Sequence, residues 1–138
     1  MKILIINGPN LNLLGKRETQ VYGNQSFDEY FEGLKHYFSI HEIGYFQTNV
    51  EGEIINRLHL AMTEYDAVVL NPGGYAHTSV AIRDAIVAIT IPVVEVHISN
   101  VYSREEFRKN MLTAAVSKGC VTGFGLKGYS LAIQSLIS

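Results

Sequence analysis

Short, unbroken runs of branched apolar residues constrain this chain more than any other feature. Residues 3–6 read Ile-Leu-Ile-Ile and residues 67–70 read Ala-Val-Val-Leu, with no polar side chain in either run. Strands that face water on one side alternate polar and apolar residues, whereas unbroken runs are typical of strands covered on both faces. We therefore expect a parallel sheet with helices on both faces.

Helical patterns separate five expected strands. The strands are predicted at residues 3–6, 43–48, 67–70, 92–96 and 120–122, and the helices at 26–38, 51–65, 78–89, 103–118 and 129–137. Two of the helices begin with a capping box, Ser26-x-x-Glu29 and Ser103-x-x-Glu106. This alternation predicts one doubly wound α/β domain over residues 1–138, and the flavodoxin-like strand order 2-1-3-4-5 is the leading choice at this length.

The composition excludes several classes of protein. Hydrophobic residues make up 47% of the chain and charged residues 17%, which is outside the range of intrinsic disorder. The net charge of −2 and the pI of about 6.2 give no basic footprint for nucleic acid. No apolar run is long enough for a membrane span or a secretory signal, and the single cysteine, Cys120, fits a reducing compartment. A cytoplasmic protein without nucleic-acid or membrane partners is expected.

Polar side chains gather where strands one, three and four end. In a doubly wound sheet, ligands bind beyond the carboxyl ends of the strands. The residues expected at this edge are Asn10, Arg17, Tyr22, Asn71, His77, His97 and Ser99. Two imidazoles, a phenol, an arginine, a hydroxyl and two amides suit a small polyhydroxylated or anionic substrate and proton transfer. For any single one of Asn7, Asn10 and Asn12, a simple turn residue is an equally good interpretation.

The long polar segment after the first strand is expected to carry a lid, at about residues 15–25, because loops of this length are usually functional. Residues 123–128 match G-x-G-x-x-G, but no acidic residue follows at the spacing a dinucleotide site requires. No pair of histidines has the His-Glu-x-x-His spacing of a metal site. No cofactor and no metal are therefore expected.

Several motifs taken together resemble the type II 3-dehydroquinate dehydratases over nearly the whole chain. They are Asn7-Gly8-Pro9-Asn10-Leu11-Asn12-Leu13-Leu14-Gly15, Arg17-Glu18, Tyr22-Gly23, Gln47-Thr48-Asn49, Asn71-Pro72-Gly73-Gly74, His77-Thr78-Ser79, Glu95-Val96-His97-Ile98-Ser99-Asn100, Arg104-Glu105-Glu106-Phe107-Arg108 and Gly123-Phe124-Gly125. The resemblance implies anti elimination of water from 3-dehydroquinate to 3-dehydroshikimate through an enolate. This is the third step of chorismate and aromatic amino acid biosynthesis, and it needs no metal, cofactor or Schiff base.

The resemblance also implies catalytic roles. Tyr22 matches the proton acceptor, His97 the proton donor, and Asn10 the residue that holds a water on the enolate oxygen. Arg17 matches the arginine beside the tyrosine, and a nearby cation favours the phenolate and steadies developing negative charge. Glu95 lies two residues before His97 on the same strand, and we expect it to orient that imidazole.

Binding roles follow from the same matches. Asn71 and the backbone amides of Ile98 and Ser99 match a carboxylate clamp, and His77 and Arg108 match residues that hold the ring hydroxyls. Asp84 reads from the sequence alone as a solvated helix charge. Its counterpart in the family reaches the active site of a neighbouring subunit in a dodecamer built as a tetramer of trimers.

Two departures and three alternatives accompany this interpretation. Thr19 stands where the family commonly has proline, and Val101-Tyr102-Ser103 follows the Ser-Asn pair where histidine or a small residue is usual. The alternatives are a flavodoxin-like module that binds a ligand without chemistry, a catalytically silent relative, and a hydrolase with Ser99 or Ser79 as nucleophile.

Overall fold

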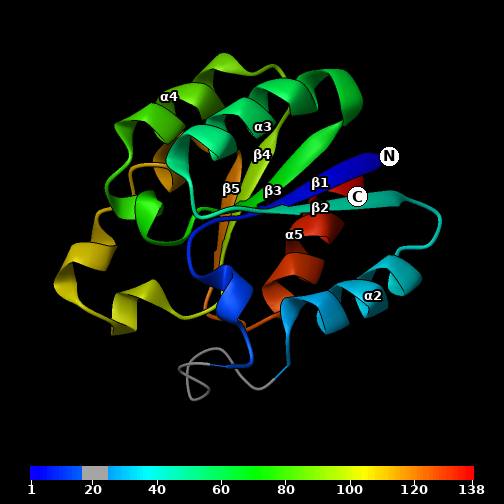
Figure 1. The fold of residues 1–138 in the computed structure, drawn as a ribbon, viewed down its shortest axis with the longest axis horizontal. Helices are drawn as coiled ribbons and strands as arrows, with labels where there is room; N and C mark the ends of the chain where they lie inside the picture. The colour runs from blue at the N-terminus through cyan, green and yellow to red at the C-terminus, as the bar shows by residue number, and fades with distance from the viewer. Residues whose placement is uncertain (17–24) are drawn as a thin grey trace.

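One five-stranded parallel sheet organises the structure, a computed structural model that describes residues 1–16 and 25–138. The strands are β1 (Lys2–Asn7), β2 (Glu42–Gln47), β3 (Ala67–Asn71), β4 (Val93–His97) and β5 (Gly119–Thr122). Their spatial order is β2-β1-β3-β4-β5, and every neighbouring pair is parallel (Figure 1). The predicted doubly wound order is confirmed.

Helices cover both faces of this sheet. On one face lie α2 (Phe27–Tyr37) and α5 (Lys127–Ile137), and on the other lie α3 (Glu51–Glu64) and α4 (Val80–Ala88) (Figure 1). In β1, Ile3 and Ile5 join the core under α2 and α5, while Leu4 and Ile6 join the core under α3 and α4. Successive strand residues point to opposite faces, so an unbroken apolar run supplies both cores at once.

The segment between β4 and β5 differs from the prediction of a helix over residues 103–118. It forms three short 3-10 turns, at Val101–Ser103, Glu106–Lys109 and Ala114–Val116, so the described residues hold four α-helices and not five. The Ser103 hydroxyl donates to the Asn100 carbonyl instead of capping a helix. Long-range bonds hold the segment instead, because the Leu112 N–H donates to the Ala76 carbonyl at 2.9 Å.

The other capping box behaves as predicted. Ser26 is the N-cap of α2, and its hydroxyl accepts from the Glu29 N–H at 3.2 Å. Phe27 of α2 belongs to the core, with Tyr30 and Phe31 packed against it, and its ring stacks on Tyr45 with centroids 4.6 Å apart. Within the described part of the chain, no helix is long and apolar enough to cross a bilayer.

Candidate active site

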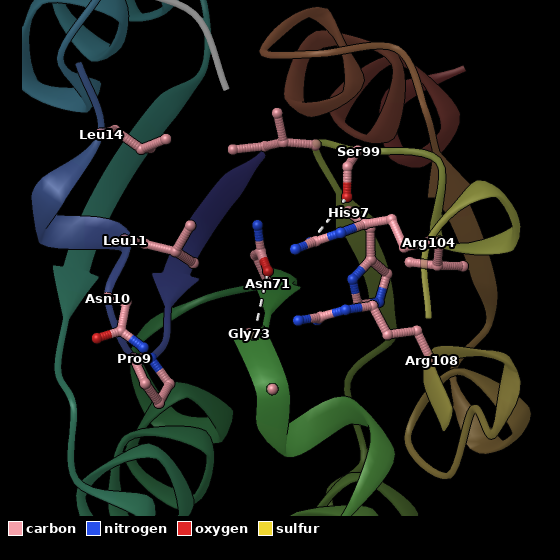
Figure 2. A pocket seen from close by; sticks show the side chains of 13 residues that line it. Pro9, Asn10, Leu11, Leu14, Asn71, Gly73, His97, Ser99, Arg104 and Arg108 are labelled. Atoms are coloured by element: carbon pink, nitrogen blue, oxygen red, sulfur yellow. Dashed lines mark hydrogen bonds between the residues drawn. The ribbon is translucent and has the colours of Figure 1, made fainter. Parts of the chain in front are cut away.

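A pocket of about 140 Å³ opens at the carboxyl ends of β1, β3 and β4 (Figure 2). Its lining comes from Pro9, Asn10, Leu11, Leu14, Asn71, Gly73, Gly74, His97, Ile98, Ser99, Val101, Arg104 and Arg108. The loops after three neighbouring strands therefore converge here, as the parallel topology requires. Four residues predicted near this edge, Asn10, Asn71, His97 and Ser99, line the same pocket.

At the floor of the pocket, Asn71 is held at both ends of its amide. Its Nδ2 donates to the Tyr129 hydroxyl at 2.9 Å, and its Oδ1 accepts from the Gly73 N–H at 3.1 Å. Tyr129 in turn donates to Asn7 Oδ1 at 2.7 Å, and its complete burial raises the pKa of the phenol. Tyr129 thus stays protonated and fixes the amide, which leaves one Asn71 N–H for a ligand.

His97 is oriented by a carboxylate. Its Nε2 lies 2.6 Å from Glu95 Oε2, and Glu95 is fully buried. The other carboxylate oxygen accepts from the Thr113 hydroxyl at 2.5 Å. Because a carboxylate only accepts, Nε2 carries a proton and Nδ1 is the ring nitrogen available for proton exchange.

His77 is buried and is not one of the residues that line the pocket, and its ring centroid lies 6.0 Å from that of His97. Its Nδ1 lies 3.1 Å from the Asn110 carbonyl, which requires a proton on Nδ1. Burial is the largest influence on the His77 pKa and lowers it, assisted by nearby His97 and Arg108. A neutral His77 therefore presents Nε2 as a hydrogen-bond acceptor.

Two guanidinium groups point into the pocket towards Asn71 (Figure 2). Arg108 Nε lies 3.0 Å from Glu105 Oε1, and Arg104 Nη1 donates to the Ser99 hydroxyl at 3.3 Å. The hydrogen bond from Arg108 lowers the pKa of the exposed Glu105 carboxyl. With these two cations, the pocket favours an anionic ligand.

Comparisons with known proteins show the family of the chain. The family model for Dehydroquinase class II matches residues 1–137. The chain belongs to this family. Among curated relatives, 3-dehydroquinate dehydratase of Clostridium botulinum (strain Loch Maree / Type A3) is 49% identical over 138 residues, covering 99% of this chain and 94% of the relative. That of Actinobacillus pleuropneumoniae serotype 5b (strain L20) is 48% identical over 139 residues, covering 99% and 90%.

A solved structure leads to the same conclusion. The type II dehydroquinase from Butyrivibrio crossotus DSM 2876 superposes with a TM-score of 0.97 at 46% identity, covering 100% of this chain and 98% of that one. The family resemblance read from the sequence is confirmed, and with it the prediction of an enzyme, a hydro-lyase of the type II dehydroquinase class.

Some predicted site residues are outside the part of this class II dehydroquinase that the structure describes, and some described ones are not part of the pocket lining. Arg17, Tyr22 and most of the predicted lid fall outside the described residues. Asp84 is on α4, where its side chain is exposed and lies 3.4 Å from Arg83 Nη1, and it does not line the pocket.

Sequence reasoning missed Arg104 and Thr113. Arg104 belongs to a motif that carried the family resemblance, but the predicted helix over residues 103–118 did not indicate that its side chain points into the pocket. Thr113 reaches Glu95 only because the same segment is a set of turns. The four-residue spacing of Arg104 and Arg108 was the available signal for the first, and no sequence pattern indicated the second.

Proposed function

We propose that this class II dehydroquinase removes water from 3-dehydroquinate to give 3-dehydroshikimate, in the biosynthesis of chorismate and aromatic amino acids. Family membership supports the reaction, and relatives about half identical to this chain carry the name 3-dehydroquinate dehydratase. The observation that carries the proposal is the Glu95–His97 pair, 2.6 Å apart, at a pocket that also holds two guanidinium groups. A proton donor beside a cationic pocket fits dehydration of a hydroxylated acid.

The elimination is anti and proceeds through an enolate. A base removes the proton beside the ketone, and the electron pair forms the enolate. The acid in this step is His97 as an imidazolium, protonated on both ring nitrogens. The enolate reforms the ketone with expulsion of the hydroxyl, which takes the Nδ1 proton and leaves as water, and His97 becomes neutral. The proton on Nε2 stays paired with Glu95, so the imidazole keeps its orientation throughout the step.

Tyr22 is the base in this proposal, and Arg17 stabilises the phenolate and the developing negative charge. Their support is the match of Arg17-Glu18 and Tyr22-Gly23 to the family motifs. Asn10 holds a water on the enolate oxygen. Its backbone supports a fixed position, because it adopts a left-handed φ of 70° and its N–H donates to Asn49 Oδ1 at 3.0 Å.

Substrate binding uses the rest of the pocket. Asn71 and the backbone amides of Ile98 and Ser99 hold the carboxylate. The carbonyls of this turn accept from the Gly125 N–H and the Thr122 hydroxyl, which keeps its amides in place. His77 and Arg108 hold the ring hydroxyls, one as an acceptor and the other as a donor.

Asp84 completes the site of a neighbouring subunit in an oligomer of trimers, arranged as a dodecamer in the cytoplasm. Two observations support this part of the proposal. Asp84 is exposed and does not line the pocket of its own chain. The α4 surface around it also exposes large apolar residues, Val80 at 58% and Val87 at 62%.

The test is an absorbance assay that detects the conjugated enone of the product. The parent should form the enone from 3-dehydroquinate with borohydride present or absent, because no Schiff base forms. Tyr22→Phe should lose the activity while keeping its fold and oligomeric state.

Failure of the folded parent to form the enone would favour a silent relative or a ligand-binding module. The hydrolase alternative has little support. Ser79 caps α4 by accepting from the Ile82 N–H and donates to Glu51, while Ser99 accepts from Arg104.

A further inference from the structure

A second use of the buried carboxylate follows from the register of β4 and β5. Glu95 pairs with Cys120 across these strands, so their side chains stand beside each other on one face of the sheet. His97 is two residues beyond Glu95 and points to the same face. One ligand atom from each of Glu95, His97 and Cys120 lies within 4.8 Å of the other two.

We propose that Glu95, His97 and Cys120 form a binding site for a borderline-soft divalent cation such as Zn²⁺, and that occupancy of this site inhibits the enzyme. A thiolate, an imidazole and a carboxylate are the ligands that Zn²⁺ prefers. Three protein ligands leave a fourth position for water. This site is a brake on the reaction and not a cofactor site.

The geometry requires only small movements. In a tetrahedral zinc site, neighbouring ligand atoms are roughly 3.3–3.8 Å apart, as follows from zinc–ligand bonds of about 2.0–2.3 Å. The present separation of His97 Nε2 and Glu95 Oε2 is 2.6 Å, so the ion would push this pair apart and draw the thiol inward. Oε1 of Glu95 can stay on the Thr113 hydroxyl, which then orients the ligand from outside the metal shell.

The ion can reach this site from solvent, and the proton that it displaces can leave. Cys120 is exposed on the edge strand β5, which gives the ion a route to the buried pair. Binding of the ion displaces the proton of the Cys120 thiol to solvent, and His97 binds through a deprotonated Nε2 as a neutral imidazole that carries its one proton on Nδ1. Since Nε2 and Glu95 then serve the metal, the pair that delivers the proton in catalysis is taken apart. The inhibition rests on the role of His97 in the proposed function. Binding of the metal ion does not depend on that role.

The first experiment measures binding without activity, using Co²⁺ as the probe on the intact oligomer. A cobalt–thiolate charge-transfer band in the near ultraviolet is expected for the parent, together with one equivalent of metal per chain by equilibrium dialysis. Cys120→Ser and Cys120→Val should both lose the band. His59→Ala, which removes an exposed imidazole from α3, should keep it and serves as the matched control. Absence of the band in the parent, or its survival in both Cys120 variants, would overturn the site.

The second experiment measures the enone rate with added Zn²⁺. Basal activity of the Cys120 variants should equal that of the parent, because Cys120 does not line the substrate pocket. Half-inhibition of either variant should need at least about tenfold more Zn²⁺ than the parent. Loss of a residue that only supports a metal ligand already lowers metal affinity by about 10- to 100-fold, so loss of a ligand should cost at least the lower figure. Inhibition should reverse with a chelator. Equal inhibition of parent and variants would overturn the brake, whereas a cobalt band without any inhibition would support the site and contradict the role of His97.

Discussion

At the scale of single residues, the site depends on side chains whose hydrogen-bonding capacity is already in use. Glu95 is fully buried and uses one oxygen for His97 and the other for Thr113. A buried carboxylate is tolerated only when such partners satisfy it. The same partners hold its position, so the bonds that satisfy the buried carboxylate are also the bonds that would orient His97 in the proposed reaction.

Replacement of Glu95 by glutamine should lower kcat more than it changes KM. The amide keeps the shape but can present an N–H to His97 Nε2, which disfavours the tautomer that carries its proton there. We expect kcat to fall by about 10- to 100-fold, less than the roughly 10²–10⁴-fold that a general acid supplies. The enone assay measures both constants.

Glu106→Gln is the matched control for this change. Glu106 is a surface carboxylate that pairs with Lys109, and its replacement should leave kcat and KM unaltered. If Glu95→Gln retained the full parental rate, Glu95 would not position His97.

At the scale of elements, the two capping boxes show how tertiary contacts override a local signal. Ser26 caps α2 as its sequence predicts, because the following residues can bury Phe27 and Leu34 against the sheet. Ser103 has the same signature, but its segment is drawn towards Ala76 and Glu95 by contacts distant in sequence. A cap stabilises a helix by about 1 kcal/mol, which such contacts outweigh.

Alanine at these two serines should therefore have different effects on stability. Ser26→Ala should lower the free energy of unfolding by about 0.5–2 kcal/mol, since a helix N-cap is lost. Ser103→Ala should change it by less than about 0.5 kcal/mol, as expected for an exposed residue that caps no α-helix. Chemical denaturation of both variants measures the difference, and equal losses would contradict the structural distinction.

At the scale of the whole molecule, one hydroxyl joins three elements beneath the pocket. Tyr129 on α5 donates to Asn7 at the end of β1 and accepts from Asn71 at the end of β3. The fold and the pocket floor therefore share the same bonds.

Tyr129→Phe should destabilise the protein by about 2–6 kcal/mol, because the buried amide groups of Asn7 and Asn71 each lose a partner at about 1–3 kcal/mol. Tyr37→Phe, at a tyrosine that is 71% exposed, is the matched control and should have no measurable effect. Denaturant unfolding of the two variants tests this. A loss as small as that of the control would show that the buried network contributes little.

Subunit cooperation in the site can be tested by complementation. Asp84→Ala and His97→Ala oligomers should each be nearly inactive. Dissociation and reassembly of a mixture should restore activity, because some sites then receive Asp84 from one chain and His97 from another. A fully active monomer, or a mixture no better than its components, would contradict the proposed role of Asp84.

The sequence by itself determined the sheet, its order and the family of the chain. Buried parallel strands have a local signature, since residues such as those of β1 must be apolar on both faces. The family is recognisable because its motifs carry Asn71, His77 and His97 at fixed spacing. Only the tertiary structure decided the path from β4 to β5, the inward turn of Arg104, and the contacts of Glu95 with Thr113 and Cys120. These depend on residues far apart along the chain, and no local pattern encodes a balance between a helix cap and bonds made across the fold.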